Sequence, residues 1–425
     1  MNKKKESKVV PKVRFKGFTD DWKQRKFGDL ADYKKGPFGS AIIKDMFVPK
    51  SKESIKVYEQ QNAINKDWEL ERYFLPKEYA LTKLKSFEVH GGDIIVSCAG
   101  TIGEIYEIPE NADTGVINQA LMRVRVDEDC VDKRMFKIAF SNMIDDFTRV
   151  HSNGSAIKNI PPFSDLKPMG VLLPSLQEQE KISSYFEKLD NLITLHQQKI
   201  TLLAKLKKAM LEKMFPKKGT VIPEIRFNGF ANAWEQRKLG DIVERVTRKN
   251  QNIVSDLPLT ISAQYGLIDQ NEFFDKRVAS KDVSGYYLIY NGEFAYNKSI
   301  SNDAPWGAIK RLDKYENGVL STLYIVFKIK NEEKTNSDFI ATYYDTNIWH
   351  KDIKAIAAEG ARNHGLLNIT PADFFETKLK FPKNVLEQQK IGIYFGNIDH
   401  LITLHQRKID KIKNMKKAML DQMFI

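Results

Sequence analysis

Residues 178–215 read EQEKISSYFEKLDNLITLHQQKITLLAKLKKAMLEKMF, and residues 387–424 return this stretch as EQQKIGIYFGNIDHLITLHQRKIDKIKNMKKAMLDQMF. Aligned without gaps, the two stretches are identical at 22 of 38 positions. A second pair agrees, because residues 11–33 recur at 223–245 with 11 identities in 23 positions. The two offsets, 209 and 212 residues, are nearly equal. The chain is therefore an internal duplication of two units of similar length.

The repeated stretch predicts a long helix in each copy. Its apolar residues alternate in steps of four and three over more than four heptads, which is the a/d stripe of a coiled coil. At 1.5 Å per residue the helix is a rod of about 57 Å, so its stripe needs a partner, and each copy is the obvious partner of the other. The expected seam and register residues are Ile182, Phe186, Ile193, His196, Ile200, Ile391, Phe395, Ile402, His405 and Ile409.

Two polar residues interrupt the stripe at equivalent steps of both copies. An antiparallel pairing brings His196 and His405 close to a pseudo-two-fold axis, and we hypothesise that they set the register of the helices. The alternative is that each histidine reaches the surface or packs passively. Lys207 and Lys416 are expected to lay their stems on the seam and hold their ammonium groups in water.

Further leucines lie beside the stripe and widen the apolar face of both helices. Helices of other subunits could cover this face and complete a four-helix bundle, or the chain's own inserts could pack on it. The leucines are Leu192, Leu195, Leu202, Leu206, Leu401 and Leu404.

Between the repeated ends lie two inserts, residues 34–172 and 246–380, that show little resemblance to each other. A framework kept twice around two different inserts holds two different recognition surfaces. This organisation favours a binding protein.

Each insert mixes short β-like runs with turns and a helical segment. The runs are residues 93–108 and 120–126 in the first insert and 318–330 in the second. Helices are expected around 131–149 and 336–358. A compact α+β domain fits both inserts.

The irregular stretches of the inserts carry amides, cations and glycines suited to base edges and phosphates. Polar loops are also common merely because they are solvated, so only the clustering of these residues favours DNA contact. In the first insert the predicted DNA-binding residues are Lys34, Lys35, Ser40, Gln61, Asn62, Asn118, Gln119, Lys158 and Asn159. In the second they are Gln264, Tyr265, Tyr296, Asn297, Lys298, Trp306, Arg362, Asn363 and His364.

Composition agrees with a globular protein that has an anionic partner. The 425 residues are 42% hydrophobic and 29% charged, with a net charge of +12. The two cysteines, Cys98 and Cys130, are too few for a disulfide framework or a zinc site and are expected to be small buried hydrophobes. No run of eighteen apolar residues and no signal-peptide pattern occur, so we expect a cytoplasmic protein.

A search for catalytic motifs finds no G-x-x-x-x-G-K-[ST], no G-x-S-x-G and no H-E-x-x-H in the sequence. Residues 159–163, NIPPF, differ from the Asn-Pro-Pro-aromatic motif of amino-methyltransferases because Ile160 breaks its spacing. We expect neither catalytic nor metal-binding residues in this chain.

The order of these motifs resembles the specificity (S) subunit of Type I restriction-modification enzymes over nearly the whole chain. The first copy carries RFKGFTDDWKQRKFGDL, then SCAGTIGEIYEIP and INQAL; its most specific element is LPSLQEQEKI at 173–182, matched by VLEQQKI at 385–391. The second copy departs from this pattern, because it lacks GTIG and reads RNHGLLNIT where the first has GSAIKNIPP.

The resemblance implies an α+β protein with two globular target-recognition domains, separated by two long antiparallel coiled-coil helices and related by pseudo-two-fold symmetry. We expect five segments, listed in chain order: an N-terminal tail at 1–19, a first recognition domain at 20–175, a central helix at 176–216, a second recognition domain at 217–384 and a C-terminal helix at 385–425.

The resemblance further implies that each domain reads one half of a bipartite, asymmetric site in double-stranded DNA. The helices would act as a ruler and dock two modification subunits, which methylate adenine N6; restriction subunits would join this core. S-adenosylmethionine, ATP and Mg would be bound by the partners, and this subunit would be noncatalytic. The alternatives are a coiled-coil adaptor whose inserts bind protein, and a single-chain nuclease or methyltransferase.

Overall fold

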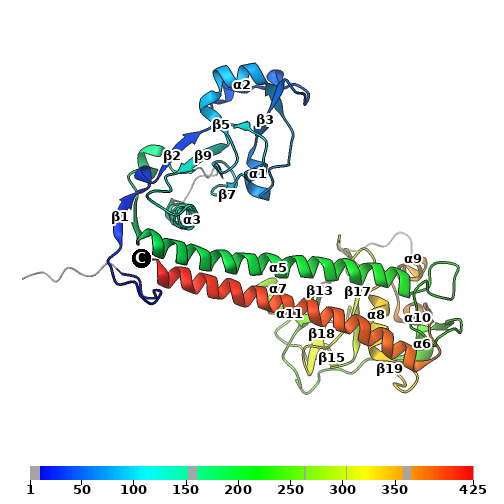
Figure 1. Ribbon diagram of the computed structural model, residues 1–425. Helices are drawn as coiled ribbons and strands as arrows, with labels where there is room; N and C mark the ends of the chain where they lie inside the picture. The colour runs from blue at the N-terminus through cyan, green and yellow to red at the C-terminus, as the bar shows by residue number, and fades with distance from the viewer. Residues whose placement is uncertain (1–9, 152–159, 263–264, 303, 358–364, 425) are drawn as a thin grey trace, which may run out of the picture. The chain divides into compact units, whose positions relative to one another are not determined.

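The computed structural model describes residues 10–151, 160–262, 265–302, 304–357 and 365–424. The chain divides into two compact units, Met1–Leu195 with Ile409–Ile425 and His196–Lys408. The long helices α5 (Leu176–Met214) and α11 (Val385–Met423) have 39 residues each and contribute part of their length to both units (Figure 1). The two predicted long helices are confirmed. The predicted limits of the recognition domains lie at the helix ends and not at these unit boundaries, and they remain a prediction.

Local signals decide where the long helices begin and end. At the start of α5, the Glu178 and Gln179 amides donate to the Ser175 carbonyl at 3.0 and 2.9 Å. At the start of α11, the Asn384 side chain accepts from the Leu386 amide at 2.9 Å, as an N-cap does. Pro216 follows the end of α5 and cannot continue a helix.

Within each unit the two helices run antiparallel. In the first unit the Phe186 ring lies 6.3 Å from that of Phe424, and Asp190 accepts from Lys416 at 2.5 Å. In the second unit His196 contacts His405, and further along α5 Lys207 contacts Asp399, which comes earlier in α11. In both units, rising numbers on α5 meet falling numbers on α11.

In its described residues the first unit has three small sheets and, besides α5 and α11, four α-helices. A ladder joins β1 (Lys23–Lys26) to β10 (Gly170–Leu173). One four-stranded sheet has the order β2 (Ala31–Lys35), β9 (Leu121–Val126), β6 (Ile94–Ser97), β7 (Ile105–Glu107). The other has the order β4 (Phe74–Pro76), β3 (Ser54–Tyr58), β8 (Gly115–Ile117), β5 (Glu88–Val89). The helices are α1 (Gln60–Asn65), α2 (Lys77–Lys83), α3 (Lys133–His151) and α4 (Phe163–Leu166).

The second unit repeats the first two of these sheets. A ladder joins β11 (Glu235–Lys238) to β20 (Lys378–Phe381), and a four-stranded sheet has the order β12 (Val243–Val246), β19 (Ile325–Ile329), β16 (Phe294–Asn297), β17 (Ala308–Arg311). Two separate ladders pair β13 (Leu259–Ser262) with β14 (Gly266–Asp269) and β15 (Tyr287–Tyr290) with β18 (Asn317–Leu320). The helices are α6 (Leu239–Ile242), α7 (Gln270–Phe274), α8 (Ser337–Tyr344), α9 (His350–Ile356) and α10 (Pro371–Phe375).

The two units therefore share a framework that their sequences do not reveal. The sheet order β2-β9-β6-β7 matches β12-β19-β16-β17 strand for strand, and every pairing in both sheets is antiparallel. The units differ in their remaining strands, outside the two shared sheets. There the parallel pair β3–β8 of the first unit is reduced to one bridge, Pro258 with Val319, in the second.

Some elements differ from the sequence-based expectations. Residues 93–108 form the hairpin β6–β7, because Gly100 and Gly103 adopt positive φ angles of 67° and 81° in its turn. Residues 318–330 fall into two strands on different sheets, and the expected helix at 336–358 is two helices, α8 and α9.

Repeated residues clamp each unit to the start of a long helix. Arg14 donates to both carboxylate oxygens of Glu178 at 2.6 and 2.7 Å, and Arg226 does the same to Glu387 at 2.5 and 2.8 Å. Both carboxylates are buried. These pairs explain why the R-F and E-Q motifs recur together.

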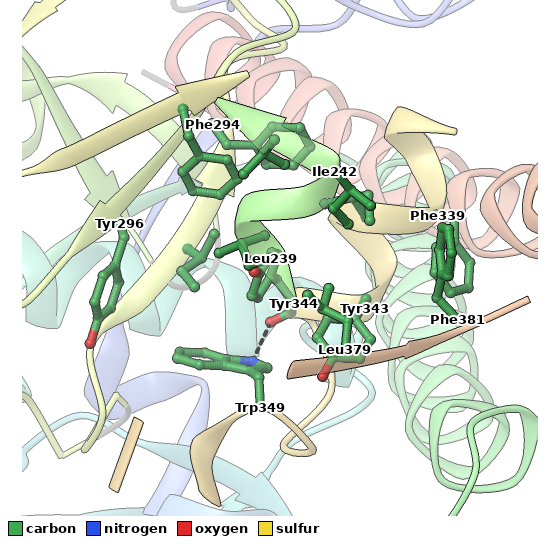
Figure 2. Packing of buried hydrophobic residues seen from close by; sticks show 14 of the residues in the cluster. Leu239, Ile242, Phe294, Tyr296, Phe339, Tyr343, Tyr344, Trp349, Leu379 and Phe381 are labelled. Atoms are coloured by element: carbon green, nitrogen blue, oxygen red, sulfur yellow. Dashed lines mark hydrogen bonds between the residues drawn. The ribbon is translucent and has the colours of Figure 1, made fainter. Parts of the chain in front are cut away.

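The core of the second unit is aromatic (Figure 2). Phe294 stacks on Phe327 with centroids 5.3 Å apart, and Tyr296 stacks on Phe374 at 4.9 Å. The Trp349 indole N–H donates to the Tyr344 carbonyl at 3.1 Å (Figure 2). The Tyr296 hydroxyl donates to the Trp306 carbonyl at 2.8 Å, so the whole Tyr296 side chain belongs to the core.

The cysteines differ from each other in burial. Cys98 is buried, as expected, and burial raises the pKa of its thiol to about 12. Cys130 is exposed, because it lies in the turn before α3, so the prediction that both are buried is wrong for this residue. Within the described residues, none of the helices combines the length and apolar character needed to cross a membrane.

Candidate nucleic-acid interface

Three loops of the first unit meet at one end of the strands in the sheet β2-β9-β6-β7. This end of the sheet is called its edge below. The loops follow β2, join β6 to β7 and precede β9, which places all of them where these strands end or begin. The Gly36 amide donates to the Leu121 carbonyl and the Cys98 amide to the Ala120 carbonyl, both at 2.8 Å. The Ile160 amide donates to the Cys98 carbonyl at 3.2 Å. The topology thus gathers segments that lie far apart in the sequence.

Helix α1 contributes a further polar side chain to this edge. Gln60 donates through Nε2 to the Ala99 carbonyl at 2.5 Å and to the Thr101 carbonyl at 3.1 Å. Its amide therefore fixes the β6–β7 loop. Gln61, the next residue, is exposed and bonds only within its own helix, where its Oε1 accepts from Asn65 at 3.1 Å.

The prediction that Asn62 contacts DNA is wrong. Its side chain is 2% exposed and caps α1, where Oδ1 accepts from the Glu59 amide at 2.8 Å. Its Nδ2 donates to the Asp67 and Leu70 carbonyls at 2.9 and 2.8 Å. Every polar atom of the amide is used inside the domain, so no base edge can reach it.

The other predicted residues of the first insert take different positions at the edge. Lys35, Ser40 and Gln119 are exposed, and half-buried Lys34 holds its ammonium 4.9 Å from the centroid of the Phe87 ring. Asn118 is half-buried and turns its Oδ1 to the Ala120 amide at 3.0 Å. Lys158 and Asn159 lie outside the described residues.

The composition of this edge suits a polyanion. Its segments 34–41, 60–62, 98–103 and 115–120 contain no aspartate or glutamate, although 55 of the 425 residues are acidic. Amides, hydroxyls and lysines without competing carboxylates are the groups that bind base edges and phosphates.

The second unit builds the same edge with other residues. The Leu367 amide donates to the Lys298 carbonyl at 2.9 Å, as the Ile160 amide does to Cys98 in the first unit, and the Ile300 amide donates to the Gly365 carbonyl at 2.8 Å. Segments 247–252, 297–302, 321–323 and 365–370 again carry no carboxylate.

Lys298 directly follows β16 and is one of the cations of this second edge. Burial, and secondarily the neighbouring Arg245, lower the pKa of its ammonium, and Nζ lies 3.4 Å from the Ile369 carbonyl. A phosphate placed there would relieve the repulsion between Lys298 and Arg245. Arg245 was not predicted as a site residue, because the basic residues of a strand end look like any solvated cations in the sequence.

The remaining predicted residues of the second insert separate into several groups. Tyr296 is buried in the core, so its predicted DNA contact is wrong. Asn297 and Trp306 are half-buried, and Asn297 Oδ1 accepts from the Ser299 amide at 3.0 Å. Tyr265 is 63% exposed beside the turn between β13 and β14. Gln264, Arg362, Asn363 and His364 lie outside the described residues.

The helices place their polar seam residues in direct contact. His196 and His405 approach with their Nδ1 atoms 3.0 Å apart, which requires one ring to donate and the other to accept. Lys207 donates to Asp399 and to Asp345 at 2.7 Å, and its equivalent Lys416 donates to Asp190. Carboxylates hold both ammonium groups: the Lys207 pair with Asp345 is largely covered, against the prediction, whereas the Lys416 pair with Asp190 stays exposed to water.

The other predicted seam residues are inward or partly covered. Ile182, Phe186, Ile391, Phe395 and Ile409 are buried, whereas Ile193, Ile200 and Ile402 are half-buried. The burial of these residues does not test whether they set the register of the helices. That role stays a prediction.

The leucines beside the seam are exposed in both units. Leu192 and Leu195 are each 44% exposed in the first unit, and their equivalents Leu401 and Leu404 are 41% and 38% exposed in the second. Leu206 and its equivalent Met415 are 43% and 38% exposed. Each unit therefore presents an equivalent apolar trio.

Comparison with known proteins assigns the family. The family model described as the Type I restriction modification DNA specificity domain matches residues 19–205 and again residues 231–414. The chain belongs to this family and carries its domain twice, which confirms both the duplication and the resemblance to specificity subunits. No curated protein gives a significant match.

One solved structure supports the fold. The S subunit of a Type I restriction-modification system from M. genitalium is 16% identical, with a TM-score of 0.61 over 98% of this chain and 99% of that chain. The HsdS subunit from Thermoanaerobacter tengcongensis is 13% identical, with a TM-score of 0.41 over 95% of this chain and 96% of that one. At 16% identity the likeness to the M. genitalium subunit concerns the fold alone.

Proposed function

We propose that this chain reads a bipartite, asymmetric target in double-stranded DNA and delivers it to the other subunits of a Type I restriction-modification complex. One observation carries the proposal: the same four-stranded framework ends, in both units, in loops of different sequence that carry amides, hydroxyls and cations. Equal frameworks with different loop residues favour two unlike half-sites. The recognition domains are taken as residues 20–175 and 217–384.

Two modification subunits dock on the exposed leucines of the helices in this proposal. Leu192 and Leu195 with Met415 in one unit are equivalent to Leu401 and Leu404 with Leu206 in the other. An apolar face that occurs twice suits two copies of one partner, and helices on such a face would form a bundle. Restriction subunits are proposed to join this core.

The chemistry is proposed to belong to the partners. In the part of the chain that the structure describes, no group of three or more histidine, cysteine or carboxylate side chains is placed to hold a metal ion. The modification subunits would supply S-adenosylmethionine and methylate adenine N6, and the restriction subunits would use ATP and Mg. The chain itself would be noncatalytic and would act in the cytoplasm.

The test is single-molecule sequencing of methylated adenine in DNA from cells that carry the chain with a modification subunit, compared with cells that lack the chain. A chain-dependent, two-part motif with unlike halves is expected. Absence of such methylation while the modification subunit still copurifies would favour the alternative, a coiled-coil adaptor whose inserts bind protein.

A further inference from the structure

Phe38 is 91% exposed, more than any other large hydrophobic side chain in the described part of the chain. It follows buried Pro37 in the loop that leaves β2 and makes no contact with another aromatic ring among the described residues. Single exposed apolar residues are common on protein surfaces. Phe38 differs from these because its loop is held so firmly.

Gly36 seats this loop against the backbone of the turn at 118–119, whereas Gly39 meets only the end of the Gln119 side chain. A Cβ on Gly36 would lie 1.8 Å from the Asn118 carbonyl oxygen, and one on Gly39 would lie 2.7 Å from Gln119 Oε1. The Phe38 carbonyl accepts from the Ala41 amide at 2.9 Å. Close packing at Gly36 thus holds the backbone before Phe38, and the turn to Ala41 holds the backbone after it, which lowers the entropy cost of ordering the loop.

The surroundings of the ring favour nucleic acid over protein. Exposed Lys35, Ser40 and Gln119 lie in the same two segments, and neither segment carries a carboxylate. A protein hot spot is generally an aromatic residue inside a wider apolar patch. An isolated ring among cations and amides is instead the arrangement of side chains that wedge between base steps while polar neighbours hold the backbone.

We propose that Phe38 inserts its ring into the base stack of the half-site read by the first unit. This inference rests on the proposed DNA-reading function and adds a residue that selects sequence through deformability, because pyrimidine–purine steps unstack most easily. At the equivalent position of the second unit, Asn250 is fully buried and its Nδ2 donates to the Ser255 carbonyl at 2.8 Å. The loop after β12 exposes Ile253 and Val254 instead, at 59% and 53%, so the inference concerns the first unit alone.

The test uses the full chain in complex with its modification subunit. The DNA duplexes contain the sequence motif that adenine-methylation sequencing identifies. 2-Aminopurine replaces one base at a time in both half-sites, and its fluorescence reports unstacking. For the wild type, a rise is expected at one step of the first half-site. Phe38→Ala should abolish the rise and weaken binding roughly 5- to 150-fold, the range that alanine substitution gives for an aromatic side chain stacked on a base.

Two further variants separate the wedge from general effects. Phe38→Leu should keep part of the signal, because leucine can also wedge between bases. Leu81→Ala removes another exposed apolar side chain, 41% exposed on α2, and should change nothing.

Three outcomes would contradict the inference. If the wild type binds its motif specifically but Phe38→Ala binds equally well without loss of fluorescence, the wedge is wrong and the DNA-reading function stands. If Phe38→Ala loses the modification subunit in the absence of DNA, the ring contacts protein. If the wild type directs no sequence-specific methylation, the proposed function fails and the wedge fails with it.

Discussion

At the scale of single residues, the bidentate pair of Arg14 and Glu178 shows why a short motif recurs at both ends of each unit. The Glu178 side chain is completely buried and that of Arg14 is 13% exposed. Removing one partner of such a pair leaves a buried charge without compensation, which costs far more than the pair itself contributes.

Glu178→Gln is therefore expected to destabilise the first unit by about 3 kcal/mol, the lower end for a buried pair because Arg14 keeps some contact with water. Hydrogen exchange should show faster opening of residues 176–189 and unchanged opening of residues 387–398. Glu180→Gln, at an exposed position two residues further along α5, is the matched control. Equal opening in Glu178→Gln and wild type would contradict the role of the pair.

The histidine contact makes the second unit sensitive to pH. Burial, then His196 and then Lys199 and Lys408 lower the pKa of His405 below its usual value of 6.5. The unfolded chain consequently takes up this proton at a higher pH than the folded chain. The contribution of His405 to the stability is fully present above about pH 6.5. It is lost as the pH falls from there toward the lowered pKa of the folded state.

We expect His405→Gln to flatten this pH dependence between pH 7 and 5. Chemical unfolding of the variant and the wild type at a series of pH values measures the two slopes. Burial also lowers the pKa of His350, and both proteins keep that contribution, so the difference between them isolates the histidine pair. Identical slopes would show that the contact carries no proton-dependent energy.

Residue-scale prediction from sequence succeeded where spacing alone decides position. Equivalent steps of a seven-residue repeat place His196 opposite His405 in an antiparallel pair, and the structure brings them into contact. It failed for Tyr296 and Asn62, because the sequence of a loop does not reveal which polar groups the domain uses internally. It missed Phe38, since a phenylalanine between proline and glycine gives no sign of its exposure.

At the scale of elements, a glutamine after each clamping glutamate fastens a second element to the long helix. Gln179 accepts from the Asp132 amide before α3 at 3.0 Å and donates to the Pro174 carbonyl at 2.9 Å. Gln388 accepts from the Asn336 amide before α8 at 2.8 Å. The repetition of E-Q was visible in the sequence, but its partners were not, because they lie in the dissimilar inserts.

The exposed leucines provide a prediction about stoichiometry. Leu192→Glu with Leu195→Glu should remove one of two modification subunits by placing charge on an apolar docking face, and Leu401→Glu with Leu404→Glu should remove the other. Native mass spectrometry of the purified complex counts the copies. All four changes together should leave none.

Asn191→Glu is the control for this experiment, since it adds one glutamate charge at an exposed polar position of α5. It should leave two copies bound. Two copies retained by the leucine variants as well would mean that the docking surface lies elsewhere.

At the scale of the whole molecule, the duplication and the pair of long helices followed from the sequence, because repeats and heptads are local patterns. The common sheet framework of the two inserts did not, since β2-β9-β6-β7 and β12-β19-β16-β17 are built from different residues with the same strand order. Many different combinations of apolar side chains can fill the core beneath the same sheet. Framework and recognition surface can therefore vary independently.

This independence is the central claim, and exchange of one insert tests it most directly. Residues 34–172 are replaced by the corresponding insert of another family member, and methylated adenines are sequenced in cells that carry the hybrid chain with the modification subunit. We predict that one half of the recognised motif changes and the other half stays as in the wild type. A simultaneous change of both halves would contradict the account.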